Sequence, residues 1–600
     1  MIRKLSEGLR NISKNSKRLY VALEVCSIFF LVQTAAGCSA PGPFAVLINT
    51  LLSISVFLML SCATGEIRGV LNTMLIVSVI YAAADRFVMQ ARGMVITPAD
   101  LFSLKTALTV AGNYHSDIYI GTIISMAAAA VFLFFNTWLA DITWKKTKER
   151  LVLFLSGICG TIAIIAGVIA GPFCPNVFYY DKNTQGSENG VFISFIHDIK
   201  ALRLKAPDGY DKAKAEQILR QYKSDQDAAQ KEKPDIVVIM DEAYTNLSWL
   251  SDTLKNDNSY IPATKCILSG GCANTQSGCL HVSVLGGNTA NTEYEFLTGN
   301  SAAFLPPDSI PYELYIHSDT DLSYALPEEL KLLGYKSCSI HPYYAGGYNR
   351  DTVYKIFGFD ESMFMDTFDK EYGDTWKIRE YYSDKAVFDK AWKILQSGDE
   401  PKFIFAVTMQ NHGLYSNGNG PDCLKGLDFS LSNRKEYFGK EDIDTYITLQ
   451  NETDKEIAAF LKEIDSMDKK TIVVFFGDHE PGPAVTKEIS DFHTGSNADY
   501  YKVPFFIHAN FKIRGETGIE TSPNYLGGLL LEAAGLPENS YRKYIADTQK
   551  KYPVLSTQYI CGNNRKEIDP DSAVQIRTLK DYANIQYLLM TGRKQNRKIH

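Results

Sequence analysis

The N-terminal part of the chain contains five long apolar segments, and these constrain its fold more than any other feature. They lie at about 19–37, 43–62, 69–88, 118–140 and 151–171. Each approaches the ~20 residues that an α-helix needs to cross a bilayer. A cleaved signal peptide is the alternative interpretation of the first segment, but the four apolar segments that follow it favour a membrane anchor. We therefore predict a transmembrane domain of five helices over residues 1–171.

Basic residues indicate how these spans are oriented. The loop between the fourth and fifth segments carries Lys145, Lys146, Lys148 and Arg150, and a further group of lysines and arginines precedes the first segment. Such residues concentrate on the cytoplasmic side of membrane proteins. With five spans, everything after about residue 172 then lies outside the cytoplasm. We expect a multi-pass protein of the cell membrane whose C-terminal domain is extracellular.

Two stretches near the predicted spans are open to alternatives. Thr97, Pro98 and Asp100 form a capping-box pattern that predicts the start of an amphipathic helix, lying either on the outer membrane surface or against the other spans. Residues 172–233 are interpreted as a connector. Within it, the apolar stretch 190–196 is expected to form a strand or an interfacial segment.

Residues 234–600 have the mixed composition of a soluble domain, in which strand-like and helical stretches alternate. Apolar runs rich in β-branched residues occur at 235–240, 401–409 and 471–476, and a helical pattern covers about 441–466. This alternation is typical of a mostly parallel sheet with helices on both faces. The predicted fold class is a multi-pass α-helical membrane domain followed by an extracellular α/β domain.

The charge of the chain argues against one class of partner. The formal net charge is −7, the isoelectric point is near 5.9, and no long basic stripe occurs beyond the N-terminus. Proteins that bind nucleic acid usually carry such a basic surface. We therefore expect no nucleic acid as a partner. The predicted spans instead make a lipid bilayer the expected partner.

Four residues of the C-terminal domain form a candidate metal site. Glu242 follows the strand-like run 235–240, Asp478 and His479 follow 471–476, and Thr289 lies on a glycine-rich turn before a helical stretch. Each residue alone could be a helix cap or a turn residue. Parallel strands, however, deliver their carboxyl ends to one edge of a sheet. Two carboxylates, an imidazole and a hydroxyl suit a divalent cation, which would also activate the threonine as a nucleophile.

These residues also resemble the motifs of the lipoteichoic acid synthase family, within the alkaline-phosphatase/sulfatase superfamily. The matching motifs are Asp241-Glu242, the turn 288–294, Gly477-Asp478-His479-Glu480, the block 341–350 and Asn411-His412. The block carries a His, an aromatic residue seven places on and an Arg nine places on, here His341, Tyr348 and Arg350. Tyr348 stands where better-studied members have Trp. The membrane spans, the connector and the outward-facing catalytic domain match the layout of the family.

The resemblance implies a sulfatase-like catalytic domain over residues 234–600 and a phosphoglycerol transferase activity. Thr289 would be the nucleophile, His412 would act in catalysis and on the substrate, and His341, Tyr348 and Arg350 would bind the glycerol phosphate group. The implied metal is one divalent ion, with Mn²⁺ expected first and Mg²⁺ or Zn²⁺ as alternatives. The implied donor is phosphatidylglycerol, and the acceptor is a polyglycerolphosphate, a glycolipid or a glycan.

Three other functions remain alternatives. A phosphoethanolamine transferase would share the spans and the threonine, a phosphodiester hydrolase would release glycerol phosphate to water, and a non-catalytic membrane protein would keep only the fold. Sulfate-ester hydrolysis through a formylglycine is disfavoured, because no cysteine of the chain opens a C-x-P-x-R sequence. A threonine in the nucleophile position favours transfer of a phosphoryl-type group.

Overall fold

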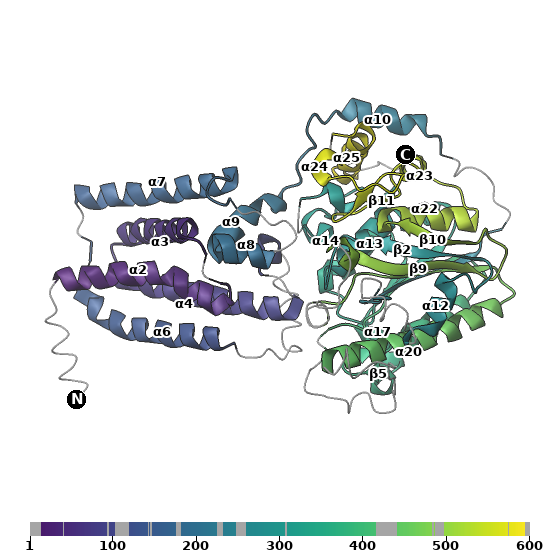
Figure 1. Ribbon diagram of the computed structural model, residues 1–600, viewed down its shortest axis with the longest axis horizontal. Helices are drawn as coiled ribbons and strands as arrows, with labels where there is room; N and C mark the ends of the chain where they lie inside the picture. Colours follow the sequence, from purple (N-terminus) through teal and green to yellow (C-terminus); the bar gives the residue numbers. More distant parts are fainter. Residues whose placement is uncertain are drawn as a thin grey trace, which may run out of the picture. The chain divides into compact units, whose positions relative to one another are not determined.

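The computed structural model divides the chain into two compact units (Figure 1). Unit one comprises Met1–Leu104, Val110–Arg203 and Pro307–Ser309, and unit two comprises Lys105–Thr109, Leu204–Pro306 and Ile310–His600. The residues that the structure describes are 14–39, 41–92, 95–101, 119–141, 143–144, 147–175, 182–224, 232–247, 260–306, 309–413, 415, 441–482, 485, 497–573 and 575–594. The division falls inside the predicted connector, so the domain boundaries at 171 and 233 stay a prediction.

Unit one contains, among its described residues, five helices that are long and apolar enough to cross a membrane. They are α2 (Lys14–Ala36), α3 (Pro43–Thr64), α4 (Ile67–Arg92), α6 (Ile120–Asn136) and α7 (Lys148–Ala170). Each overlaps one of the apolar segments predicted from the sequence.

Small and polar residues join these helices to one another. An added Cβ at Gly157 of α7 would lie 2.5 Å from the backbone nitrogen of Met59, so glycine allows α3 and α7 to approach closely. Asn136 at the end of α6 donates to Glu24 Oε1 of α2 at 2.8 Å and to Asn72 Oδ1 of α4 at 2.9 Å. Buried polar groups that find partners in this way fix how the helices pack.

The connector is helical where the sequence predicted a strand or an interfacial segment. Helix α8 (Lys182–Asn189) is followed by α9 (Val191–Asp198), which replaces the predicted 190–196 segment. The side chain of Gln33 accepts the first N–H of α9, at Val191, with a distance of 3.2 Å, and Phe192 stacks on Tyr81 at 5.9 Å. Docking against the spans therefore decided the conformation of this short apolar stretch.

The segment after Thr97 shows only the beginning of the predicted helix. Asp100 Oδ2 accepts the backbone N–H of Thr97 at 2.6 Å, and Pro98–Leu101 forms a single 3₁₀ turn. The rest of the predicted amphipathic helix lies outside the described residues.

Unit two is built on an eight-stranded sheet with the order β10-β2-β9-β8-β1-β7-β3-β4. The strands are β1 (Asp235–Asp241), β2 (Thr275–His281), β3 (Lys336–Ile340), β4 (Glu361–Met363), β7 (Lys402–Val407), β8 (Thr471–Gly477), β9 (Lys502–Ala509) and β10 (Glu516–Thr521). Only the pairs that involve β9 are antiparallel. The central strands β1, β7 and β8 are buried along their whole length, as expected for a sheet covered on both faces.

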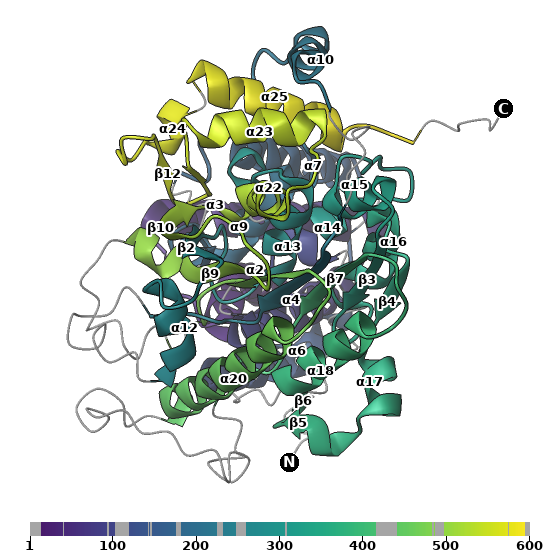
Figure 2. The ribbon, with the colours of Figure 1, turned by 90° about the vertical axis from the view of Figure 1, so that its right-hand side faces the viewer.

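Helices cover both faces of this sheet (Figures 1 and 2). Helices α13 (Thr289–Thr298) and α22 (Pro523–Ala534) lie on one face, and α12 (Pro262–Leu268), α18 (Asp384–Leu395) and α20 (Glu441–Asp465) lie on the other. The remaining longer helices of the unit are α10 (Lys212–Gln221), α15 (Leu326–Leu332), α16 (Arg350–Phe357), α17 (Met365–Glu371), α23 (Ser540–Gln549) and α25 (Arg577–Met590). The predicted fold class, membrane helices followed by a mostly parallel α/β domain, is confirmed.

Gly477, the last residue of β8, provides a test of this packing. An added Cβ there would lie 2.0 Å from the backbone oxygen of Tyr244. We expect Gly477→Ala to destabilise unit two by about 1–3 kcal/mol, because backbone must move to relieve the overlap. The midpoint of thermal unfolding of the full-length protein in detergent measures the effect.

Gly528→Ala is the matched control. The nearest atom to an added Cβ at Gly528, in α22, is Glu538 Oε1 at 3.7 Å, an ordinary contact. Alanine is also the better helix former, so this variant should be at least as stable as the parent protein. Equal unfolding midpoints for the two variants would contradict the close contact between the backbone of Tyr244 and Gly477.

Candidate active site and metal centre

Four neighbouring parallel strands of the sheet deliver the candidate residues to one edge. In β1 and β8, Asp241 is paired with Gly477, so the residues that follow, Glu242 and Asp478, emerge side by side. The next strands along the sheet, β7 and β3, run in the same direction and are followed by His412 and His341. The carboxyl edge of a parallel sheet is the usual place for a ligand site in α/β proteins.

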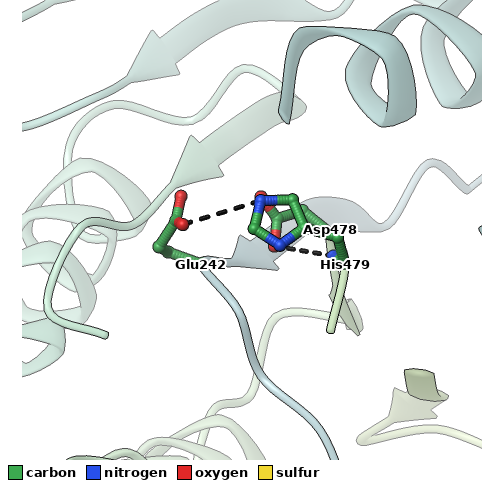
Figure 3. A group of neighbouring side chains, drawn as sticks. All are labelled: Glu242, Asp478 and His479. Carbon is green, nitrogen blue, oxygen red and sulfur yellow. Dashed lines mark hydrogen bonds and ion pairs between the residues drawn. The ribbon is translucent and has the colours of Figure 1, made fainter. Parts of the chain in front are cut away.

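Glu242, Asp478 and His479 form a buried cluster (Figure 3). One ligand atom from each lies within 4.8 Å of the others, and this is the group among the described residues that could hold a metal ion. His479 Nε2 lies 3.1 Å from Asp478 Oδ2 and 3.7 Å from Glu242 Oε1. His479 Nδ1 lies 2.9 Å from the backbone oxygen of Glu480, which acts only as an acceptor. This contact places the proton on Nδ1 and leaves the Nε2 lone pair facing the carboxylates.

Thr289 begins α13 and points its hydroxyl into this cluster. Its Oγ1 lies 3.4 Å from Glu242 Oε2 and 3.5 Å from His479 Nε2. The turn before it is sharp, since Gly286 and Asn288 have φ values of 65° and 61°. One turn further on, Thr292 Oγ1 donates to the backbone oxygen of Asp478 at 2.8 Å and fastens the helix to the end of β8. The start of α13 thus places a threonine hydroxyl beside the three candidate metal ligands.

The electrostatics of the cluster fit a bound cation. Burial raises the pKa of Glu242 well above its usual value, and the charge of Asp478 raises it further, while Arg350 opposes the shift. Burial also raises the pKa of Asp478. Two carboxylates buried together are unfavourable unless positive charge balances them. With an imidazole nitrogen and a hydroxyl oxygen beside them, these residues fit one divalent cation.

Arg350 is held by a carboxylate that the sequence motifs had left without a role. Glu293 Oε1 accepts from Arg350 Nε at 3.0 Å and also from Nη2, while Glu293 Oε2 accepts from Tyr354 Oη at 2.7 Å and Tyr312 Oη at 3.3 Å. The ion pair is almost fully buried, with 3% of Arg350 and none of Glu293 exposed. The ring of Tyr348 lies 5.1 Å below the guanidinium carbon. Arg350 is therefore fixed in one orientation by charge, hydrogen bonds and stacking.

His341 lies against this pair and uses both ring nitrogens. Nδ1 lies 3.1 Å from the backbone oxygen of Val407, and Nε2 lies 3.1 Å from Arg350 Nη1. The imidazole therefore donates from Nδ1 and accepts at Nε2. Burial, with the charge of Arg350, holds the pKa of His341 well below its usual value. His341 thus contacts Arg350 directly, and its role on the substrate stays a prediction.

His412 contacts its described surroundings through Nδ1. Nδ1 lies 2.5 Å from the backbone oxygen of Gly413 and 3.2 Å from Tyr381 Oη, so the proton lies on Nδ1. Burial lowers the pKa of His412 to about 4, so the imidazole is neutral at physiological pH and Nε2 carries a lone pair. The preceding Asn411 is anchored by its side-chain amide, which donates to Asp241 Oδ1 at 2.8 Å.

The structure thus gathers all eight residues singled out in the sequence along one edge of the sheet: Glu242, Thr289, His341, Tyr348, Arg350, His412, Asp478 and His479. Sequence reasoning missed Glu293, Tyr381 and the anchoring of Asn411 by Asp241. Glu293 had a signal, because it follows Thr289 by four residues and therefore lies one helical turn along the same face. Tyr381 had none, since it comes from a short hairpin distant in sequence.

The fold and this edge of the sheet define an α/β domain of the alkaline-phosphatase/sulfatase superfamily. Residues 236–536, half of the chain, match the family model described as "Sulfatase". The chain belongs to the sulfatase family.

Two curated relatives narrow the resemblance. The chain is 27% identical over 430 residues to a "Putative cyclic beta-1,2-glucan modification protein" of Rhizobium meliloti (strain 1021), covering 69% of this chain and 64% of the relative. It is 24% identical over 313 residues to "Lipoteichoic acid synthase 2" of Bacillus subtilis (strain 168), covering 47% of this chain and 45% of the relative. The chain thus spans less than two thirds of either relative. The resemblance to lipoteichoic acid synthases predicted from the sequence is confirmed.

A solved structure shares the architecture. The integral membrane protein lipooligosaccharide phosphoethanolamine transferase A (EptA) from Neisseria meningitidis aligns with a TM-score of 0.50 and 13% identity, covering 88% of this chain and 97% of that chain. The identity is low, so this similarity shows a common fold.

Removing the charge of Glu293 should damage the site. In Glu293→Gln the buried guanidinium of Arg350 loses its counter-charge, which costs about 3–5 kcal/mol when one partner of a buried pair is removed. We expect a clear fall in the midpoint of thermal unfolding at pH 7, measured on the full-length protein.

Glu295→Gln is the matched control on the same helix. Burial raises the pKa of Glu295 from 4.5 to about 8, so this carboxyl keeps its proton at pH 7 and an amide replaces it at little cost. The folded protein binds this proton more tightly than the unfolded chain, so the stabilisation is full below pH 4.5 and is lost as the pH rises towards 8. Glu295→Gln should flatten that decline. Equal destabilisation by both variants at pH 7 would contradict the assignment of charge to Glu293.

Proposed function

We propose that the protein is a membrane-anchored phosphoglycerol transferase. It moves glycerol phosphate from phosphatidylglycerol to a hydroxyl of a cell-envelope polymer, glycolipid or glycan, on the extracellular side of the cell membrane. The observation that carries the proposal is the Thr289 hydroxyl, buried between Glu242 and His479 at 3.4 and 3.5 Å. The names of the relatives support the class, since one is a lipoteichoic acid synthase and one a glucan modification protein.

The cofactor in this proposal is one divalent cation, with Mn²⁺ expected first and Mg²⁺ or Zn²⁺ as alternatives. Glu242, Asp478, His479 and Thr289 would hold it. When bound, such a cation favours the ionised form of the threonine hydroxyl and offsets the charge of a phosphodiester. The hydrogen bond from His479 Nδ1 to the backbone oxygen of Glu480, at 2.9 Å, keeps the other ring nitrogen directed at the site.

Thr289 is the nucleophile of the first step. Its Oγ1 forms a bond to the phosphorus of phosphatidylglycerol, and the bond from phosphorus to the diacylglycerol oxygen breaks. The products are diacylglycerol and a glycerophospho-threonine. The diacylglycerol oxygen takes up a proton to replace the one that Thr289 lost. An acceptor hydroxyl then attacks the same phosphorus and releases Thr289, so the two displacements should give ping-pong kinetics.

Arg350 and His412 serve the transferred group in this proposal. Glu293 and His341 hold the guanidinium of Arg350 in place, and in this proposal its positive charge faces the non-bridging oxygens of the phosphodiester. His412 Nε2 takes the proton of the acceptor hydroxyl. Tyr348, stacked under Arg350, covers the glycerol.

A phosphoethanolamine transferase is the second candidate, favoured by the fold shared with the Neisseria protein. The charges near the site favour the glycerol donor. Arg350 contacts His341, and Arg379 Nη2 donates to the backbone oxygen of His412 at 2.8 Å. The guanidinium of Arg379 beside His412 would repel the ammonium of an ethanolamine headgroup.

Brief exposure to each lipid should identify the donor and the nucleophile together. We expect intact-protein mass spectrometry to show a glycerophosphate adduct on Thr289 after incubation with phosphatidylglycerol and Mn²⁺. Phosphatidylethanolamine should give no adduct, and neither should Thr289→Ala, because it lacks the hydroxyl.

Thr289→Ser is the matched control, since serine keeps a hydroxyl at the same position. It should still form the adduct, at a lower rate. An adduct on Thr289→Ala, or a phosphoethanolamine adduct on the parent protein, would overturn the nucleophile or the donor, respectively.

A further inference from the structure

Unit one contains an apolar pocket that the proposed function does not use. It encloses about 500 Å³, within the range of about 300–1,000 Å³ that is usual for sites that take small ligands. Its walls come from α2, α3 and α4, which lie beside one another (Figure 1), and from the segment before α7. We call it the α2–α3 pocket. The residues that line it all belong to unit one, at the end where α2 begins.

One face of α2 forms a wall of the pocket. Arg18, Val21, Ala22 and Val25 line it, at the spacing that places side chains on one face of a helix. Arg18 and Ala22 are exposed, whereas Val25 is buried. The pocket therefore leads from the surface of the unit at Arg18 towards the interior at Val25. Seven residues of helix separate these two positions, a distance of about 10 Å.

The inner end of the pocket is apolar. Phe57 of α3 and Ile67 of α4 are both buried and join Val25 in one hydrophobic cluster. Among the described residues that line the pocket, Arg18 is the one charged side chain. An interior of this kind disfavours a charged group and suits a hydrocarbon chain.

The wall opposite α2 is held in place by hydrogen bonds at the end of α3. Trp144 Nε1 donates to Ser61 Oγ at 3.1 Å, and the backbone N–H of Trp144 donates to the backbone oxygen of Gly65 at 3.0 Å. Arg150 Nε donates to the backbone oxygen of Cys62 at 2.6 Å. The indole ring is thus fixed, and tryptophan is typical of the level at which lipid headgroups lie. The outer part of the pocket is therefore preformed.

Arg18 lies at the outer end of the pocket with its charge unbalanced. The candidate membrane span of α2 is Asn15–Ala36, so Arg18 belongs to its first turn, at the level of the headgroups. Within the described part of the chain, Arg18 has no hydrogen bond or ion pair. Pockets between membrane helices that carry a basic side chain at this level bind the headgroups of anionic lipids.

A phospholipid matches both ends of the pocket at once. Its phosphate lies at the level of the headgroups, and its acyl chains enter the hydrocarbon layer. The depth of the pocket, about 10 Å, lies within one leaflet, which is about half of the ~30 Å hydrocarbon core. A soluble anion would leave the apolar interior unfilled. A neutral lipid would leave Arg18 without a counter-charge.

We propose that the α2–α3 pocket binds one acyl chain of an anionic phospholipid whose phosphate pairs with Arg18. With the orientation predicted from the sequence, this lipid belongs to the cytoplasmic leaflet, away from the predicted extracellular domain. It is therefore a lipid that the protein holds, and not the donor that the protein consumes. No residue of unit two takes part, so the proposal does not rest on the proposed function.

Photo-cross-linking of the full-length protein in detergent tests the proposal. The probe is a phosphatidic acid with a diazirine near the end of one acyl chain, because its headgroup lacks the glycerol of the proposed donor. We expect labelling of α2 and α3 at Val25 and Phe57, located by mass spectrometry of peptides. Unlabelled phosphatidic acid should suppress this labelling at a concentration about fivefold lower than phosphatidylcholine, since one basic side chain contributes about that factor to binding of an anionic lipid.

Variants of Arg18 test the charge. In Arg18→Ala the concentration of phosphatidic acid that suppresses labelling should rise about fivefold, to that of phosphatidylcholine. Arg18→Lys keeps the positive charge and should stay within about twofold of the parent protein. Arg68→Ala is the matched control, because Arg68 is also exposed but is not among the described residues that line the pocket. It should leave the competition unchanged.

Filling the pocket tests the place of the acyl chain. In Ala22→Trp the added indole occupies the space that the chain would take, so labelling at Val25 and Phe57 should fall about tenfold or more. Leu23→Trp is the matched control on the next residue. Leu23 is 62% exposed and is not among the described residues that line the pocket, so labelling should not change.

Three outcomes would overturn the proposal. The first is equal suppression of the labelling by both lipids, which would show that the pocket does not select an anionic headgroup. The second is labelling spread over exposed residues such as Leu23 and Ile76, as expected for lipids that only surround the helices. The third is labelling at Val25 and Phe57 that survives in Ala22→Trp.

Discussion

The repulsion between two buried carboxylates is the constraint on which the rest of the site depends. Glu242 and Asp478 emerge from neighbouring parallel strands, because Asp241 pairs with Gly477 in the register of β1 and β8. Sequestered from water, both carboxyls have raised pKa values. Such a pair is tolerated when positive charge lies between or beside its members. These residues could hold a divalent cation, which would also favour the ionised form of the Thr289 hydroxyl beside them.

The second charged group of the site is neutralised separately. Arg350 is paired with Glu293, which also accepts hydrogen bonds from Tyr312 and Tyr354. Because Glu293 lies on the same helix as Thr289, α13 carries both the hydroxyl and the carboxylate that orients the arginine. A shift of α13 would therefore move the Thr289 hydroxyl and the carboxylate that holds Arg350 together.

The sequence predicted the fold and the main site residues because their signals are local. Continuous apolar runs identify strands buried on both faces, and a residue that follows such a strand lies at the carboxyl edge of the sheet. The metal-type residues and the histidines could therefore be named in advance. The direction of the His341 side chain and the conformation of α9 could not, because they depend on contacts with Arg350 and Gln33 that no local pattern records. The hairpin that places Tyr381 against His412 is likewise set by tertiary packing.

The central claim is that Glu242, Asp478, His479 and Thr289 hold one divalent cation. Anomalous X-ray scattering from crystals of the protein grown with Mn²⁺ tests it most directly. The account predicts a single strong peak within coordination distance of all four side chains, and its loss in Asp478→Asn. A peak at another site, a peak that survives in Asp478→Asn, or no peak beside Thr289 would contradict the account.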